Sequence, residues 1–145
     1  MPLQKEVTEL IPHRKPFLYV DRLEQADDTL IVGYKRFSPN EPFFDGHFPS
    51  YPVVPGVILI ECLAQCGGAG IAARSEETGS ILFLATVEKA KFRRQVRPDE
   101  EVRLEVITTR SSPSMIRQTG KAFVGTELAA EATWLCLRST SEAEA

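Results

Sequence analysis

One histidine of this sequence stands in a proline-rich segment that leads directly into a strongly apolar one. Residues 43–56 read FFDGHFPSYPVVPG, and the sixteen residues after them read VILIECLAQCGGAGIA. Five of the ten prolines lie between positions 39 and 55, so the backbone around His47 is conformationally restricted. A histidine held in a constrained loop can act as a general base. The alternative is that His47 is a structural loop residue.

A single carboxylate, Glu61, interrupts the apolar segment. Loss of hydration favours the protonated form of a carboxyl group, so Glu61 could serve as a general acid. Gln65 follows one helical turn later on the same face and could orient that carboxyl or a bound water. Alternatively, Glu61 faces solvent at a helix edge or pairs with an arginine, and spacing alone leaves both possibilities open.

The start of the apolar segment supplies backbone donors. The first N–H groups of a helix have no intrahelical partner and lie at the positive end of the helix dipole. Those of Gly56 and Val57 could therefore polarise a carbonyl oxygen, as an oxyanion hole does. Glycine at position 56 would also allow a substrate to approach the backbone closely.

Other kinds of chemistry lack the residues they need. The sequence contains no nucleophile elbow, no glycine-rich phosphate loop and no metal-ligand cluster, so we expect acid–base chemistry with no cofactor and no metal. His13, in the turn IPHRKPF, is expected to be structural. Cys62, Cys66 and Cys136 are expected to be buried, inert thiols in a reducing compartment.

The element that must position these groups is a long helix. From Gly56 to about position 73 nearly every side chain is apolar or small, which predicts a helix buried on all sides. Pro55 suits the first turn, and glycines 67, 68 and 70 allow close packing against a sheet.

The remaining elements are mainly strands. We expect a short N-terminal helix, a turn around Pro12–Pro16, an extended FLYVD segment, and strands at Leu30–Phe37, Ile81–Phe92, Val102–Arg110, Ile116–Val124 and Leu128–Leu137. Gly125-Thr126 separates the last two strands as a hairpin turn. The prediction is one α+β domain over residues 1–138, with an antiparallel sheet wrapped around the helix and a flexible tail at 139–145.

Composition narrows the choice of partners and location. The net charge of −3 gives no general attraction to nucleic acid, and the longest apolar runs are shorter than a membrane span. The N-terminus shows no secretory signal, so we expect a cytoplasmic protein without membrane contact. One local basic run is either a solvated strand end or a surface for an acidic partner, and it comprises Lys89, Lys91, Arg93, Arg94 and Arg97.

The segment NEPFFDGHFPSYPVVPGVILIECLAQ resembles the signature of the bacterial FabZ-type (3R)-hydroxyacyl-[acyl-carrier-protein] dehydratases. LIPHRKPFLYVDR resembles the N-terminal segment of that family, and KFRRQVRPDE resembles its basic strand and turn. The resemblance extends from about Leu10 to Leu137. It implies a hot-dog fold, dimers that often assemble into hexamers, and dehydration of 3-hydroxyacyl chains carried by acyl carrier protein in type II fatty-acid synthesis.

The resemblance also implies roles by matching position. His47 is the family's catalytic histidine and Glu61 its catalytic carboxylate, each contributed by a different subunit of the dimer. Gly56 binds the thioester carbonyl, and Gln65 lies beside the site. Val54, Val57 and Ile58 would line the substrate site and acyl tunnel, and the basic run Lys89, Lys91, Arg93, Arg94 and Arg97 would face the carrier protein.

Some positions depart from the family pattern. Cys62 replaces a smaller residue, Gln95 stands where proline is common, and 98–100 read Pro-Asp-Glu instead of Pro-Gly-Asp, which leaves the carrier-protein contact open. The related dehydratase–isomerases typically carry aspartate where Glu61 stands. A lyase that gives a trans-2-enoyl thioester is therefore the leading hypothesis. An acyl thioesterase and a non-catalytic acyl-chain-binding module on the same fold remain alternatives.

Overall fold

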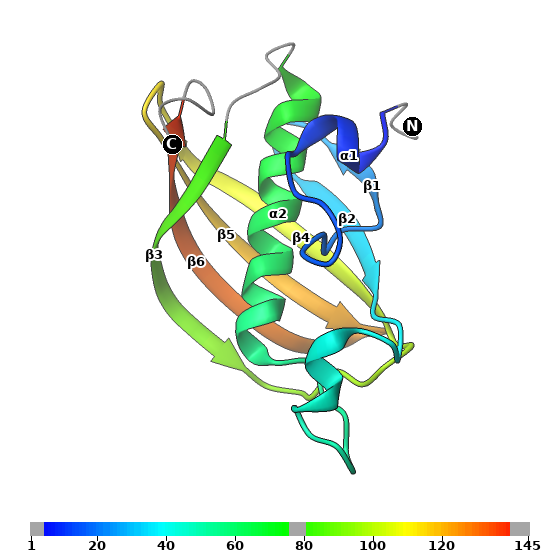
Figure 1. Cartoon of the computed structure of the whole chain (residues 1–145). Helices are drawn as coiled ribbons and strands as arrows, with labels where there is room; N and C mark the ends of the chain where they lie inside the picture. The colour runs from blue at the N-terminus through cyan, green and yellow to red at the C-terminus, as the bar shows by residue number, and fades with distance from the viewer. Residues whose placement is uncertain (1–4, 76–80, 140–145) are drawn as a thin grey trace.

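The computed structural model describes residues 5–75 and 81–139, in which a curved antiparallel sheet wraps around one long helix (Figure 1). The helices are α1 (Val7–Leu10), the 3₁₀ helix η1 (Pro42–Asp45) and α2 (Gly56–Arg74). The strands are β1 (Arg22–Ala26), β2 (Ile31–Arg36), β3 (Ile81–Phe92), β4 (Glu101–Ser111), β5 (Met115–Val124) and β6 (Glu127–Ser139). Their order in the sheet is β1-β2-β4-β5-β6-β3, with antiparallel neighbours throughout. The predicted α+β arrangement is confirmed.

The inner face of the sheet follows the alternation in the sequence. Val102, Leu104 and Val106 of β4 are fully buried against α2, whereas the arginine and glutamate between them point to the other face. β5 and β6 meet at the expected turn, where Gly125 has a φ of 59°, a conformation that glycine adopts without a steric penalty.

The first strand was not predicted at its observed place. The segment Phe17–Asp21 was expected to be extended, and β1 begins only after it, at Arg22. The carbonyl of Phe17 and the N–H of Tyr19 bind the Gln65 side chain, so these backbone groups are not available for sheet pairing. At the other end of the chain, β6 includes Ser139, which pairs with Ile81. The rest of the expected tail, 140–145, lies outside the described residues.

Helix α2 packs closely on the sheet through its glycines. A Cβ at Gly67 would overlap the Gln118 side chain of β5, and one at Gly70 would lie 2.5 Å from Ile31 of β2. A side chain at either position would therefore require its neighbour on the sheet to shift.

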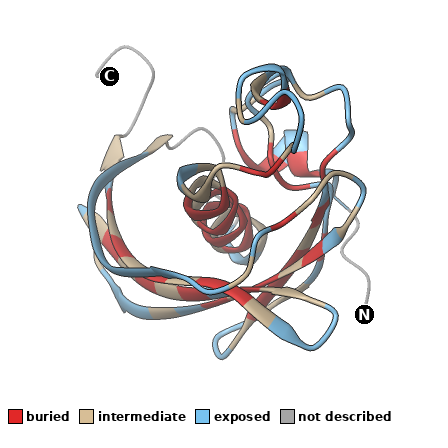
Figure 2. Ribbon diagram, turned by 90° about the horizontal axis from the view of Figure 1, so that it is seen from below, coloured by how far each residue is buried: buried red, intermediate tan, exposed pale blue. Residues whose placement is uncertain are grey.

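The helix is nevertheless not buried on all sides, contrary to the expectation from its composition. Val57 is 70 % exposed, and Glu61, Ala64 and Ile71 on the same side are only partly buried. The sheet of one chain covers only part of the helix circumference, as the end-on view shows (Figure 2). An apolar stripe of α2 is therefore left for contacts outside this chain or for a ligand.

By length and composition α2 also meets the criterion for a membrane span, contrary to the expectation that the apolar runs are too short. Its 19 residues have a mean hydropathy of 1.6 over the most apolar window. In this fold 56 % of that window is buried inside the domain, so the apolar character of α2 is that of a core helix.

Candidate active site

His47 lies in the loop between η1 and α2 and is fixed by three hydrogen bonds. Its backbone N–H donates to the Phe43 carbonyl at 3.0 Å, and its carbonyl accepts from the Val53 N–H at 2.9 Å. The ring Nδ1 lies 2.9 Å from the Val53 carbonyl oxygen. A carbonyl oxygen can only accept, so Nδ1 carries the ring proton and Nε2 keeps a free lone pair. In the neutral form of the ring, Nε2 is therefore the atom that could act as a base.

The start of α2 lies in the same pocket as His47. Gly56, Val57 and Phe92 line that pocket with His47, together with Val54. Within the described chain the backbone N–H groups of Gly56 and Val57 have no hydrogen-bond acceptor, as expected at a helix start. A Cβ at position 56 would lie 2.8 Å from the Phe92 ring. The group that closely approaches the Gly56 backbone in this chain is therefore the Phe92 side chain of β3.

Glu61 lies one turn further along α2 and is held by Gln65. The Glu61 side chain is 20 % exposed, and its Oε2 accepts a hydrogen bond of 2.9 Å from Gln65 Nε2. The Tyr19 N–H donates to Gln65 Oε1 at 2.8 Å, and Gln65 Nε2 also donates to the Phe17 carbonyl at 3.1 Å. Because the Tyr19 N–H can only donate and the Phe17 carbonyl can only accept, the orientation of the Gln65 amide is determined. Glu61 has no arginine partner within the described chain.

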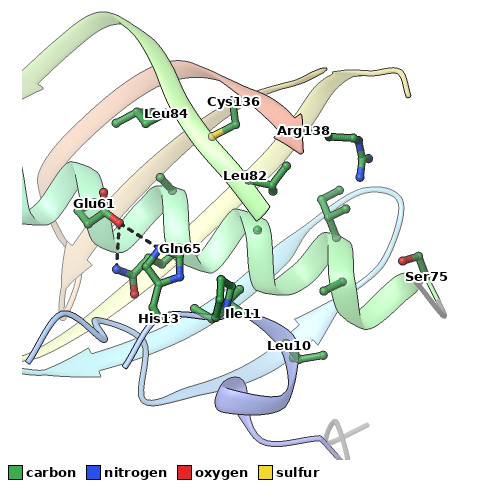
Figure 3. Close-up of a pocket in the computed structure, with 15 residues that line it drawn as sticks. Leu10, Ile11, His13, Glu61, Gln65, Ser75, Leu82, Leu84, Cys136 and Arg138 are labelled. Carbon is green, nitrogen blue, oxygen red and sulfur yellow. Dashed lines mark hydrogen bonds and ion pairs between the residues drawn. The ribbon is translucent and has the colours of Figure 1, made fainter. Parts of the chain in front are cut away.

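A second histidine lies at the Glu61 carboxyl. His13 Nε2 is 3.7 Å from Glu61 Oε2, although the sequence suggested only a structural role for His13 (Figure 3). Burial lowers the pKa of His13, while the Glu61 charge acts in the opposite direction. A signal was present in the sequence, because His13, like His47, stands in a proline-containing loop, with Pro12 before it and Pro16 three residues after it. The contact itself depends on chain folding and could not be deduced from spacing.

His47 and Glu61 do not meet within one chain. His47 lines the pocket at the start of α2, whereas Glu61 lines a different pocket with His13 and Gln65. Neither residue has a hydrogen bond or ion pair with the other within the described ranges. The two candidate catalytic groups are therefore 14 positions apart in the sequence and also separate in the folded chain.

The pocket at Glu61 continues along α2 as an apolar channel. Beyond Gln65 its walls come from α2, α1 with the segment after it, β3 and β6, and they include Ile11, Gly68, Ile71, Leu82, Leu84 and Cys136. Its far end carries the side chains of Ser75 and Arg138 (Figure 3). This lining differs from the expected one. Val54 lies in the His47 pocket, and Ile58 packs against the core without lining either pocket.

The basic run is only partly free for an external partner. Arg93 forms an ion pair with Glu131 at 2.8 Å, and Arg94 forms a bidentate salt bridge with Glu100. Arg97 donates to the Pro52 carbonyl at 2.7 Å and stacks on Tyr51, so it holds the His47 loop. Lys89 and Lys91 are exposed and have no hydrogen bond or ion pair within the described chain. The unpaired positive charge is therefore on β3.

The three cysteines are free and buried, as expected. Burial raises the pKa of Cys62 and Cys66, and it raises that of Cys136 to about 11. These thiols are protonated at neutral pH and therefore weakly nucleophilic. Within residues 5–75 and 81–139, no group of three or more His, Cys, Asp or Glu side chains is placed to hold a metal ion.

Comparison with known proteins gives a consistent result. The model of the FabA-like domain family matches residues 11–133. The 3-hydroxyacyl-[acyl-carrier-protein] dehydratase FabZ of Pelotomaculum thermopropionicum is 46 % identical over 128 residues, which cover 88 % of this chain and 91 % of that protein. The protein of the same name from Bacillus velezensis is 42 % identical, with coverage of 88 % and 92 %.

Solved structures show the same architecture. The dehydratase heterocomplex ApeI:P of Xenorhabdus doucetiae superposes with a TM-score of 0.83 at 15 % identity, covering 97 % of this chain and 94 % of the other. A hypothetical thioesterase from Streptococcus pneumoniae, solved with coenzyme A, superposes with a TM-score of 0.62 at 10 % identity, covering 81 % and 84 %. At these identities the likeness concerns the fold, and the predicted hot-dog fold is confirmed.

Proposed function

Because this chain belongs to the family of FabZ 3-hydroxyacyl-[acyl-carrier-protein] dehydratases, we propose that His47 and Glu61 are the base and acid that remove water from its substrate. The enzyme is a hydro-lyase of fatty-acid synthesis that acts on 3-hydroxyacyl chains. The observation that supports the two roles is that the two side chains suit opposite directions of proton transfer. His47 presents a free lone pair, whereas Glu61 presents a carboxyl at the mouth of an apolar channel.

His47 begins the reaction. With its Nδ1 proton donated to the Val53 carbonyl, Nε2 takes the proton from C2 of the (3R)-hydroxyacyl thioester. Negative charge then develops on the thioester oxygen. The free N–H of Gly56 at the positive end of α2 stabilises it, with Val57 next in the same turn.

Glu61 completes the elimination. One oxygen of the carboxyl, Oε2, accepts from Gln65, so the proton is carried by Oε1 and passes to the C3 hydroxyl. The C3–O bond breaks, water leaves and the trans-2-enoyl thioester forms. The proton held by His47 and the one lost by Glu61 balance, and exchange with water restores both groups.

Each active site is formed by two subunits in this proposal. β3 is an edge strand with exposed apolar side chains, and such an edge requires a covering partner. The His47 pocket contains Phe92 at one end of β3, and the Glu61 pocket contains Leu82 and Leu84 at the other end. Antiparallel pairing of two β3 strands about a two-fold axis brings unlike ends together. His47 of one subunit then faces Glu61 of the other.

The same family membership supports a proposal for the partner and the location. The substrate is a 3-hydroxyacyl chain on acyl carrier protein, and the acyl tail enters the channel beside α2. We place the enzyme in the cytoplasm as a homodimer. Three such dimers could form a hexamer, and the mass of the protein in solution distinguishes the hexamer from the dimer.

Product analysis tests this function directly. The purified protein is incubated with a 3-hydroxyacyl thioester, and the mixture is analysed for enoyl thioester and for free thiol. Enoyl thioester is the expected product. Release of free thiol would instead identify a thioesterase, and recovery of unchanged substrate would identify a binding module. Because the solved structures with similar folds include thioesterases, this distinction rests on the chemistry of the product.

A further inference from the structure

His13 has no part in the reaction described above, yet it lies against the proposed acid. It comes from the segment between α1 and β1, which crosses α2 at the level of Glu61 (Figure 3). Its ring Nε2 is 3.7 Å from Glu61 Oε2, and its side chain is 26 % exposed. The same carboxyl oxygen accepts the hydrogen bond from Gln65.

The segment that carries His13 is fixed by its own hydrogen bonds. Arg14 donates to the carbonyls of Ile11 at 3.0 Å and Thr8 at 3.0 Å, which closes the turn around His13. Three residues after Pro16, the same segment binds Gln65 through the Tyr19 N–H. One stretch of chain therefore contributes His13 and also orients Gln65 through its backbone, and both side chains lie at Glu61 Oε2.

The ring proton of His13 can be assigned from its surroundings. Desolvation lowers the pKa of His13 more than the Glu61 charge raises it, so the ring is neutral at neutral pH and carries one proton. Nδ1 is buried and has no hydrogen-bond partner within the described chain. A buried N–H without an acceptor is less tolerated than an unpaired lone pair. The proton is therefore on Nε2, which faces the Glu61 carboxyl.

We propose that His13 is a positioning residue for Glu61, and this inference rests on the proposed function. The Nε2–H groups of His13 and Gln65 both point toward Oε2, so together they oppose rotation of the carboxyl group. Oε1 alone is then left to exchange a proton with the substrate. A distance of 3.7 Å is longer than a hydrogen bond. Contacts of this kind are often long in the free enzyme and shorten when substrate binds.

The test compares three substitutions at position 13 in the full-length protein. His13→Gln keeps an N–H donor at nearly the same reach but cannot ionise, His13→Leu removes the donor, and His13→Asn keeps a polar group that falls short of Glu61. Steady-state rates are measured on a small 3-hydroxyacyl thioester over a range of pH. Circular dichroism and thermal unfolding verify that each variant is folded.

We expect His13→Leu and His13→Asn to lower kcat about 10- to 100-fold with little change in KM, because misplaced catalytic groups cost about that much. His13→Gln should stay within about 3-fold of the wild type, since it preserves the positioned donor. Removing a donor to the ionised carboxylate should also move the Glu61 limb of the kcat–pH profile to higher pH. The other groups whose pKa the Glu61 charge affects are Tyr19 of the N-terminal segment, Cys62 of α2 and Cys136 of β6, and all three are unchanged in these variants.

Two outcomes would overturn the inference. If a folded His13→Leu or His13→Asn enzyme keeps the wild-type kcat and pH profile, His13 does not position Glu61. If all three variants lose activity equally, packing of the imidazole ring is what matters, and not its donor. A wild-type enzyme without dehydratase activity would contradict the proposed function instead, so the two failures are distinguishable.

Discussion

At the scale of single residues, the two oxygens of Glu61 have different surroundings. Oε2 is 2.9 Å from the Gln65 amide nitrogen, and that amide is oriented by backbone groups 46 and 48 positions away in the sequence. A buried amide with an assigned orientation presents a fixed donor to the carboxyl. The fold therefore fixes the orientation of the carboxyl group, and the proton transfer by this group can be tested separately from its orientation.

Replacement of Glu61 by glutamine tests the chemistry alone. Glu61→Gln is nearly isosteric and can still contact Gln65, but an amide cannot give an acidic proton to the C3 hydroxyl. We expect kcat on a 3-hydroxyacyl thioester to fall about 10²- to 10⁴-fold, the usual cost of losing one positioned acid or base. Glu9→Gln, at an exposed carboxylate without an ion pair within the described chain, serves as the matched control and should keep full activity. Unchanged turnover in folded Glu61→Gln would show that Glu61 is structural.

At the scale of elements, strand β3 carries both a channel wall and free positive charge. Leu82 and Leu84 line the channel beside α2, whereas Lys89 and Lys91 are exposed and unpaired within the described chain. The arginines next to them are bound to Glu131 and Glu100. Reversing those arginines would disturb internal contacts, so a test of carrier-protein binding belongs at the lysines.

Charge reversal at the two lysines tests whether β3 binds the carrier protein. Lys89→Glu with Lys91→Glu should raise KM for substrates on the acidic carrier protein and leave small thioesters nearly unaffected, because the lysines attract the partner and not the acyl chain. The effect should weaken as salt concentration rises. The double variant Lys89→Gln with Lys91→Gln is the matched control and should give a smaller change of the same sign. Equal losses on both kinds of substrate would indicate damage to the site instead.

The width of the channel beside α2 depends on a glycine of that helix. A Cβ at Gly68 would lie 3.3 Å from Leu82 across the channel, so a longer side chain there would extend into the space for the acyl tail. Gly68→Leu should lower kcat/KM for long 3-hydroxyacyl chains and preserve it for four-carbon chains, which serve as the internal control. Leucine favours the helix over glycine by about 1 kcal/mol, so the backbone should tolerate the change. Equal activity on all chain lengths would place the tail elsewhere.

Features that depend on local sequence patterns could be predicted from the sequence, and features that depend on distant contacts could not. Both limits of β3 and the extent of α2 were predicted, because they depend on local periodicity and on proline and glycine positions. The position of β1 and the contact of His13 with Glu61 were not, since both depend on the N-terminal segment binding a residue of α2 far along the chain. The pairing of Arg93 with Glu131 was also missed, because those residues are 38 positions apart, and that of Arg94 with Glu100 was missed because it depends on the turn between them.

At the scale of the whole molecule, one chain leaves several surfaces incomplete. The outer edge of β3 has no partner strand within the described chain, and its apolar side chains are exposed. Val57 on α2 is the most exposed large apolar side chain of the molecule's described part. The His47 pocket and the Glu61 pocket each hold half of the proposed chemistry. A second copy would cover the edge strand and complete both sites at once.

Subunit mixing tests the composite site. His47→Ala and Glu61→Ala homodimers should each be nearly inactive. In a mixed dimer one site lacks both groups, while the other keeps an intact histidine from one chain and an intact glutamate from the other. With random pairing half of the dimers are mixed and each has one good site of two, so about a quarter of the wild-type activity should return after dissociation and reassociation. Two differently tagged wild-type chains, captured together, verify that subunits exchange. Exchange without regained turnover would mean that His47 and Glu61 of the same chain act together, since every site would then lack one of them.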